Sequence, residues 1–414
     1  MKFLWLSNAA WAPSGYGEQA GLFLPRFQQL GHEVAQVANY GLQATSMDWH
    51  GIRMYPGDGQ WGNTSIGTYA EHFGTDLVIC LHDAWVMKPD AWPDGLRMAI
   101  WAPIDHYPIP PAVLGVLKHP KVTPIAMSRF GEFWMDKFGL DPLYVPHGID
   151  TSIFKPQPEM REHVREALDI PKDAFLVGMV AANKGSPQFP RKGFPQAFEA
   201  FSRFVQDRDD VWLYVHTTPL PAGGGIDLEK LVLALDALSA NPGKLKGRVR
   251  FPPPSSFHLG MPKEGVAALY QAFDVLLNPA YGEGFGIPVI EAQACGVPVI
   301  ASNHSAMSEL TQAGWLVDGD PLWDALQESF AFIPSIGSIE RALEAAYASR
   351  DNAVLRTAAA TFALEYDADY VTEMYWEPAL AALERPREVK PLAAANGGGN
   401  RAQRRAAQKG KARA

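Results

Sequence analysis

Short apolar segments recur along the chain, separated by turn-forming residues and by stretches with helical spacing. The first segment, residues 3–6, leads into a glycine-rich turn and then a helical pattern that ends at Gly31, after which another apolar segment follows. Strand, loop, helix and strand in this order are typical of a βαβ unit, which crosses over right-handed between parallel strands. Because the segments do not alternate, we expect parallel strands covered on both faces. Further strands are predicted at 76–82, 97–103, 122–128 and 142–148.

A second series of the same kind begins after residue 150. Strands are predicted at 174–181, 211–217, 248–252, 274–280, 298–302 and 314–318, helices at 194–205 and 287–294, and helical structure in the remainder, including 371–384. The pattern predicts an α/β protein with two doubly wound, Rossmann-like domains facing across a cleft, where ligands bind beyond the carboxyl ends of the strands. The predicted parts are an N-terminal domain at 1–150, a second domain at 151–365, a C-terminal helix at 366–385 packing back toward the first domain, and a disordered tail at 386–414.

Charge is distributed unevenly over the 414 residues, whose formal net charge is −9. Residues 385–414 contain nine Lys or Arg and one acidic residue, so this end carries +8 and the rest of the chain −17. The tail is rich in Ala, Gly and Gln and lacks aromatic residues, so it cannot build a core. It is either a disordered, solubilising end or a basic arm that recruits nucleic acid, a protein or another anionic partner.

The two cysteines, Cys80 and Cys295, both lie in apolar surroundings. We interpret them as buried small hydrophobic residues of a reducing compartment and not as a disulfide or metal pair. The N-terminal apolar run of four residues is too short for a signal peptide, and no run reaches the length of a membrane span. The sequence therefore predicts a cytoplasmic protein without a transmembrane segment.

Two glutamates eight positions apart, Glu283 and Glu291, flank the start of the helix predicted at 287–294. Pro288 suits the first helical position, and the free amides around Phe285, Gly286 and Ile287 form an anion site at the helix N-terminus. Glu291 could accept hydrogen bonds from a vicinal diol such as a ribose, and Glu283 from hydroxyls beyond the phosphates. Phosphates flanked by two polyols describe a nucleotide sugar.

This stretch, Glu283-Gly284-Phe285-Gly286 followed by Glu291, resembles the E-x7-E element of retaining GT-B glycosyltransferases, with family 4 (glycosyl transferases group 1) the nearest fit. The resemblance continues at the N-terminal strand and loop, at the segment 126–154, at the strand, loop and helix of 179–201, and at the approach to Glu283. It implies two Rossmann-like domains of the GT-B type, the N-terminal one holding the acceptor and the second one the nucleotide-sugar donor.

The resemblance also implies roles for individual residues. Glu283 would contact the donor sugar and Glu291 the ribose, while Arg191 and Lys192 would neutralise the leaving diphosphate. The family spaces its Arg and Lys further apart, with the Arg near Asn183, so Arg191, Lys192 and Lys184 remain alternatives for this role. The implied donor site consists of Gly15, Tyr16, Gly17, Arg191, Lys192, Glu283, Gly284, Phe285, Gly286, Ile287 and Glu291.

Candidate polar groups for the acceptor follow the predicted strands of the first domain. Asp105 and His106 are favoured as acceptor-side catalytic groups, with His82 and Asp83 as a second candidate pair. His147, Ser128 and the proline-rich segment 250–257 are interpreted differently: His147 as a hinge residue, Ser128 as positional, and the segment as the place where the nucleobase usually lies.

The function expected from the resemblance is transfer of a sugar from a UDP- or GDP-linked donor to an acceptor hydroxyl, with retention and with no metal or cofactor. Alternatives are a GT-B phosphorylase, a nucleotide-sugar epimerase, or an inactive binding module tethered by its basic tail. The acceptor stays open among a modified DNA base, a protein, a glycan and a small metabolite. The aromatic-rich loops of 40–72 would select it.

Overall fold

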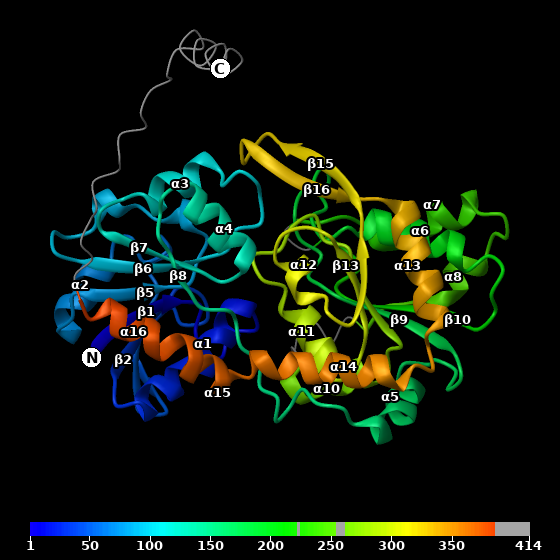
Figure 1. Ribbon diagram of the computed structural model, residues 1–414, viewed down its shortest axis with the longest axis horizontal. Coiled ribbons are helices and arrows are strands. Elements are labelled where there is room, and N and C mark those ends of the chain that lie inside the picture. Colours follow the sequence, from blue (N-terminus) through cyan, green and yellow to red (C-terminus); the bar gives the residue numbers. More distant parts are fainter. Residues whose placement is uncertain (222–223, 254–260, 386–414) are drawn as a thin grey trace, which may run out of the picture. The chain divides into compact units, whose positions relative to one another are not determined.

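The computed structural model describes residues 1–221, 224–253 and 261–385. Within this part, Met1–Glu384 form one compact unit built on two separate parallel sheets (Figure 1). We call the first sheet with its helices the first lobe and the second sheet with its helices the second lobe. The predicted α/β fold with two Rossmann-like sheets is therefore confirmed, while the basic tail at 386–414 lies outside the described residues.

The first lobe contains an eight-stranded sheet in the order β3-β4-β2-β1-β5-β6-β7-β8. Its strands are β1 (Lys2–Ser7), β2 (Glu33–Ala38), β3 (Met47–Trp49), β4 (Ile52–Pro56), β5 (Leu77–Cys80), β6 (Arg97–Ala102), β7 (Val122–Ala126) and β8 (Leu143–Tyr144). Its helices are α1 (Gly15–Gln29), α2 (Ile66–Phe73), η1 (Ala84–Val86), η2 (Pro89–Ala91), α3 (Pro111–Leu117) and α4 (Arg129–Lys137). All strand pairs are parallel except β3 with β4.

The second lobe contains a six-stranded parallel sheet in the order β11-β10-β9-β12-β13-β14. Its strands are β9 (Phe175–Val180), β10 (Val211–His216), β11 (Val249–Arg250), β12 (Val275–Asn278), β13 (Val299–Ser302) and β14 (Gly314–Val317). Its helices are η3 (Pro158–Met160), α5 (Arg161–Ala167), α6 (Phe194–Phe204), α7 (Leu228–Leu238), α8 (Lys244–Arg248), α10 (Lys263–Gln271), α11 (Ile287–Ala294), α12 (Ala306–Leu310), α13 (Ile336–Ala348) and α14 (Ala353–Ala363).

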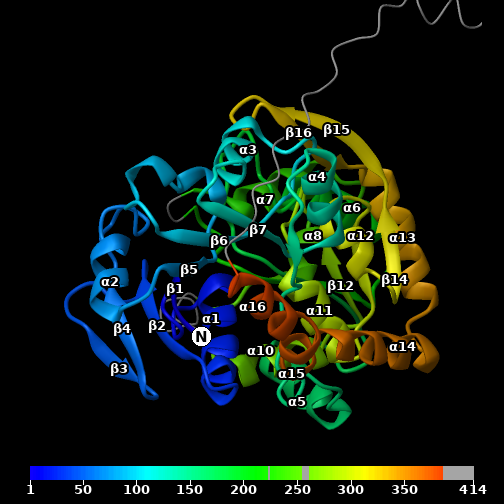
Figure 2. The same ribbon diagram turned by 60° about the vertical axis from the view of Figure 1, so that its left-hand side comes forward.

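An antiparallel hairpin stands where the sequence pattern predicted helix. Strands β15 (Gly319–Asp324) and β16 (Ser329–Pro334) pair with each other and extend from the second lobe toward the region of α3 (Figure 2). Phe330 and Tyr107 exchange backbone hydrogen bonds of 2.9 and 3.1 Å, so the hairpin is tied to the first lobe. The helical prediction was wrong here: β15 has no buried position, and β16, which is mostly buried, pairs with β15 in a separate two-stranded sheet.

The C-terminal segment returns from the second lobe to the first. It consists of η4 (Leu364–Tyr366), α15 (Ala368–Val371), η5 (Thr372–Trp376) and α16 (Glu377–Leu383), which run from α14 toward the first lobe (Figure 1). The fully buried ring of Trp376 packs against Trp5, Phe27 and Trp101, with ring centroids 5.8, 5.2 and 4.9 Å apart. Burial of aromatic rings of this size supplies a large share of a core's stabilisation.

Two predicted strands are shorter in the structure than the sequence pattern indicated. The segment 142–148 contributes only Leu143–Tyr144, and 248–252 contributes only Val249–Arg250. Both lie at sheet edges, where a single neighbouring strand supplies the hydrogen bonds that define strand structure. The edge hairpin β3-β4 was not predicted at all.

Candidate functional site

The loop between β12 and α11 carries Glu283 to the boundary between the lobes. Gly286, at φ 108°, turns the chain into α11, and Pro288 lies in the first turn, where it has no hydrogen bond to lose. Glu283 is 8% exposed, and its backbone N–H donates to the hydroxyl of Ser305 at 3.0 Å. The loop is therefore held from both of its ends.

Arg191 and Lys192 both contact the carboxylate of Glu283. The Lys192 ammonium pairs with Oε1, and a guanidinium nitrogen of Arg191 lies 3.5 Å from Oε2. Gly193, at φ 68°, makes this possible, since a Cβ there would lie 2.0 Å from the carbonyl oxygen of Pro279. The two loops are thus packed backbone against backbone, and the structure brings these three predicted residues together.

Electrostatics in this cluster favour an anionic ligand. Burial lowers the pKa of Lys192, although Glu283 acts in the opposite direction. Burial would also lower the pKa of Arg191, but Glu283, Asp105 and Asp83 together raise it. Glu283 is the carboxylate in contact with both cations, while Asp105 and Asp83 act from further away, and a phosphate group could replace Glu283 as the contacting partner.

The first lobe contributes its glycine-containing turn to the same region. Gly15, Tyr16 and Gly17 form the first turn of α1, not a loop before a later helix as predicted, because Ser14 caps the helix by accepting from the Gly17 amide at 3.1 Å. A Cβ on Gly15 would lie 3.3 Å from the Ile287 side chain at the start of α11. The two helix N-termini therefore meet across the lobe boundary.

Asp105 and His106 form an ion-paired unit that reaches both lobes. His106 Nδ1 lies 2.7 Å from Asp105 Oδ1, and Nε2 lies 3.4 Å from Asp324 of the hairpin. Burial alone would lower the pKa of His106, but the two carboxylates raise it. A Cβ on Gly282 would lie 2.5 Å from the Asp105 carbonyl oxygen, so this unit also packs against the loop of Glu283.

The second candidate pair, His82 and Asp83, lies beside Tyr16. Tyr16 Oη donates to Asp83 Oδ1 at 3.5 Å, and its ring packs edge-on against His82 with centroids 5.9 Å apart. Burial lowers the pKa of His82 to about 4, so the ring is neutral near pH 7. Its Nε2 is buried without a hydrogen-bond partner among the described residues. This atom is available to a ligand hydroxyl.

Glu291 lies on α11 and is buried, with 5% of its surface exposed. Tyr270 Oη donates to its Oε2 at 2.8 Å. Burial and the nearby carboxylate of Glu18 raise the pKa of Glu291 to about 8. Glu18 belongs to the first lobe and pairs with Lys263 of the second lobe at 3.2 Å, so Glu291 also lies at the lobe boundary.

The remaining predicted residues have positional surroundings. His147 packs against Trp101 and Phe285, with centroids 4.5 and 5.0 Å apart, and burial lowers the pKa of His147 to about 3. Ser128 caps α4 by accepting from the Gly131 amide at 3.0 Å. The nucleobase prediction at 250–257 falls partly on residues outside the described ones.

Among the described residues, neither Lys184, the remaining alternative, nor Asn183, near which the family places its Arg, contacts Glu283. The Asn183 side chain donates to the carbonyls of Thr218 and Ile226 and accepts from the Ile226 amide, so it ties two loops together. Lys184 is exposed. Of the cations considered, Arg191 and Lys192 are those that contact Glu283.

The lobes are closed over both glutamates. Besides the pairing of Phe330 with Tyr107, Glu309 Oε1 of the second lobe accepts from the Arg129 amide of the first at 2.9 Å. The contacts of Gly15 and Gly282 described above lie in the same boundary. Because Glu283 and Glu291 are both buried here, a ligand that reaches them requires the lobes to part.

Comparison with known proteins identifies this architecture. Residues 181–331 match the family Glycosyl transferases group 1. The structure resembles Anabaena Alr3699/HepE in complex with UDP-glucose, with a TM-score of 0.67, 16% identity and coverage of 92% of this chain and 100% of that one. Sucrose-phosphate synthase from Thermosynechococcus elongatus gives a TM-score of 0.66 at 16% identity, covering 92% and 97%. The protein has the GT-B fold, and its residues 181–331 are similar to group 1 glycosyltransferases.

Curated relatives are similar over part of their length. D-inositol 3-phosphate glycosyltransferase of Geodermatophilus obscurus is 32% identical over 198 residues, 45% of this chain and 40% of the relative. The protein of the same name from Corynebacterium urealyticum is 28% identical over 261 residues, 61% of this chain and 55% of the relative. The GT-B chain thus spans about half the length of these relatives or less.

Several groups at the GT-B lobe boundary were missed by sequence reasoning. Asp324, Glu18, Tyr270 and Ser305 each contact or influence a predicted site residue. Glu18 follows Gly17 directly, so its place in the first turn of α1 was a usable signal. Asp324 gave none, because its position depends on a hairpin that the pattern did not predict.

In the GT-B chain as described, no helix is both long and apolar enough to cross a membrane. Cys80 and Cys295 are buried and unpaired with each other. The cytoplasmic location stays a prediction.

Proposed function

We propose that this protein is a retaining glycosyltransferase that moves a sugar from a nucleoside-diphosphate donor, UDP- or GDP-linked, to an acceptor hydroxyl. The observation that carries the proposal is the cluster of Glu283, Arg191 and Lys192 beside the N-terminus of α11. It combines two cations and free backbone amides for a diphosphate with a carboxylate for sugar hydroxyls.

Donor binding exchanges the partners within this cluster. When the lobes part, the diphosphate takes the place of Glu283 as the partner of Arg191 and Lys192, and it rests on the amides of Phe285 and Gly286. Glu283 is then free to accept hydrogen bonds from the sugar. Glu291 has only one oxygen engaged by Tyr270, which leaves the other for the ribose diol.

The chemistry rests on charge stabilisation and needs no metal. As the bond between the anomeric carbon and the phosphate oxygen breaks, negative charge grows on the diphosphate, where Arg191 and Lys192 hold it. One preorganised donor of this kind contributes about 3–4 kcal/mol in other enzymes. In front-face transfer the acceptor hydroxyl attacks the anomeric carbon on the face that the phosphate leaves, so the configuration is kept. The departing phosphate oxygen takes the proton of the attacking hydroxyl. Closure of the lobes keeps water from competing with the acceptor.

The acceptor lies against the first lobe, where polar groups converge on Tyr16. His82 is neutral and has an unpartnered Nε2, so it can hydrogen-bond an acceptor hydroxyl without competing for the diphosphate. Asp105 and His106, which follow β6 of the same lobe, also orient the acceptor. The names of the curated relatives favour a phosphorylated polyol as acceptor, whereas the basic tail favours a macromolecule.

One neighbour supports a UDP-linked donor, since two structures of Alr3699/HepE are complexes with UDP-glucose and with UDP and glucose. The test is to incubate the purified chain with UDP- and GDP-sugars, with and without cell-extract acceptors. Release of nucleoside diphosphate together with a glycosylated product of unchanged anomeric configuration, read by mass spectrometry and NMR, is expected. Isomerised donor without acceptor would instead identify an epimerase, phosphate-dependent turnover a phosphorylase, and binding without any turnover an inactive module.

A further inference from the structure

A cavity of about 870 Å³ lies in the second lobe, away from the cluster of Glu283. Its wall includes residues at the amino ends of three strands. Ala174 directly precedes β9, Asp274 directly precedes β12, and Val297 lies two positions before the first residue of β13. Glu283 follows the carboxyl end of β12, so the cavity lies at the other end of the same strands, where they begin. Its volume is within the range of small-molecule sites.

The lining of this cavity is rich in positive charge. Six cationic side chains contribute, against three carboxylates; the cations are Lys155, Arg161, Arg165, Lys172, Arg350 and Arg356. Arg350 is neutralised from outside the cavity by Asp210 at 2.9 Å. The remaining five cations face the three carboxylates Asp173, Asp274 and Asp351, which leaves a surplus of two positive charges.

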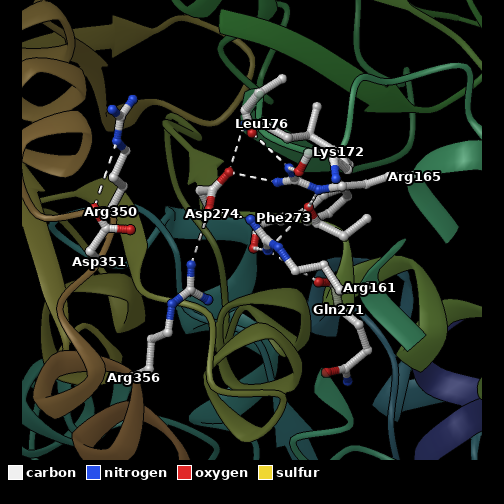
Figure 3. Close-up of polar contacts among 12 residues, drawn as sticks. Arg161, Arg165, Lys172, Leu176, Gln271, Phe273, Asp274, Arg350, Asp351 and Arg356 are labelled. Carbon is white, nitrogen blue, oxygen red and sulfur yellow. Dashed lines mark hydrogen bonds and ion pairs between the residues drawn. The ribbon is translucent and has the colours of Figure 1, made fainter. Parts of the chain in front are cut away.

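Asp274 is the centre of the cluster, and its acceptor capacity is used (Figure 3). Oδ2 accepts from Arg165 and from the Leu176 amide, both at 2.7 Å, while Oδ1 accepts from Arg161 at 2.5 Å and from Arg356 at 3.2 Å. Three guanidinium groups therefore share one saturated carboxylate. Asp351 acts on Arg356 from further away, and the surplus of positive charge remains for a ligand to neutralise.

Several donors in the cavity remain available for that ligand. Within the described part of the chain, Arg356 makes a 3.2 Å contact to Asp274 and a 3.4 Å contact to the Gly296 carbonyl, and its side chain is 30% exposed. Lys155 and Lys172 are exposed, and neither ammonium has an acidic partner among the described residues. A guanidinium fork together with two exposed ammonium groups suits a phosphate group as ligand.

The cavity also adjoins the two places where the chain passes between the lobes. Thr151 and Phe154 follow the first crossing, and Leu364 precedes the second. Two backbone hydrogen bonds of 2.8 Å join these crossings. The Ile149 amide donates to the Tyr366 carbonyl, and the Ala368 amide donates to the Ile149 carbonyl. A ligand in the cavity would therefore contact both crossings at once.

We propose that this cavity binds a dianionic phosphate group, free or carried by a small metabolite, through Arg356, Lys155 and Lys172. The site is distinct from the donor cluster and does not depend on the proposed transferase activity. A bound phosphate neutralises the surplus charge and stiffens the segments next to the crossings, 151–156 and 361–364.

Calorimetry with inorganic phosphate, pyrophosphate and glucose 6-phosphate on the full chain tests the proposal. Because pyrophosphate can also bind the cleft, the reference protein carries Arg191→Gln and Lys192→Gln. In that background Lys155→Ala with Lys172→Ala is expected to weaken binding about tenfold, since each lost charge contact contributes somewhat under 1 kcal/mol. Stronger binding of glucose 6-phosphate than of inorganic phosphate identifies a metabolite as the ligand, and the reverse identifies the free anion.

The matched control is Lys88→Ala with Lys246→Ala, which removes two exposed lysines elsewhere. It is expected to leave the affinity unchanged. Hydrogen exchange should show protection at 151–165 and 353–364 when phosphate is present. The proposal is overturned if no phosphate probe binds, if both double variants weaken binding equally, or if protection appears only outside these segments.

Discussion

Replacing Glu283 by Ala separates the catalytic role of this carboxylate from its structural role. The side chains of Glu283 and Lys192 are 11% and 15% exposed, and that of Arg191 is 34% exposed. Removing one partner of a buried ion pair costs about 3–5 kcal/mol. Arg191 is partly hydrated and Lys192 can lose its proton, so we expect the free energy of unfolding to fall by about 2–3 kcal/mol. A fold stabilised by about 5–15 kcal/mol survives that loss.

The effect of Glu283→Ala on catalysis should be much larger than its effect on folding. Loss of a contact that holds the donor sugar and the two cations in place should cost about 3–4 kcal/mol of transition-state stabilisation, which is a 10²–10³-fold fall in kcat/KM. The assay is release of nucleoside diphosphate at several donor concentrations, with urea unfolding of the same preparation.

Glu283→Gln is the matched control, because it keeps the volume and one acceptor oxygen for Lys192. It should recover most of the lost stability and only part of the activity. A Glu283→Ala protein that is folded and keeps kcat/KM within tenfold of the unaltered chain would refute the reasoning.

Three further outcomes are expected. Asp324→Asn should lower the pKa of His106; because that pKa is raised in the folded protein, the pairing stabilises below the unfolded pKa and is lost as pH rises through the folded one. The protection factors of the hairpin amides, which correct for the intrinsic pH dependence of exchange, should vary less with pH across this range in Asp324→Asn than in Asp320→Asn. Glu291→Gln should flatten stability against pH, since a carboxyl with pKa about 8 destabilises the empty protein as pH rises from its unfolded value through 8; unfolding at pH 5 and pH 9 measures this. Trp376→Ala should cost about 3–5 kcal/mol in urea unfolding, because its ring is fully buried.

The two sheets could be predicted because their strands are buried on both faces and therefore appear as continuous apolar runs. The hairpin β15-β16 could not, since Trp323 and Leu326 are exposed at 52% and 90%, β15 has no buried position, and β16 pairs with β15 and not with a strand of either large sheet. Edge strands were shortened or missed for the same reason: one neighbouring strand, and not a local preference, decides where they end.

The donor cluster could be predicted in part because Glu283 and the turn into α11 are encoded by adjacent residues. Arg191 and Lys192 lie about 90 positions earlier in the chain, and only the resemblance to a known family placed them beside Glu283. Asp324 and Glu18 reach the site by packing between lobes, which no local spacing encodes. The site-residue roles themselves stay predictions until variants are measured.

The hydrogen-bonded crossings at Ile149 and Ala368 are the natural hinge between the two lobes. The chain passes between the lobes at these two points, and they are hydrogen-bonded to each other. The hairpin β15-β16 lies on the opposite side of the lobe boundary from α15 (Figure 1). A small rotation of the second lobe about this hinge therefore moves the hairpin tip further than the parts near the hinge. The side chain of Leu326 is almost fully exposed, so it can carry a spectroscopic label. The distance from that label to the first lobe would increase when the lobes open.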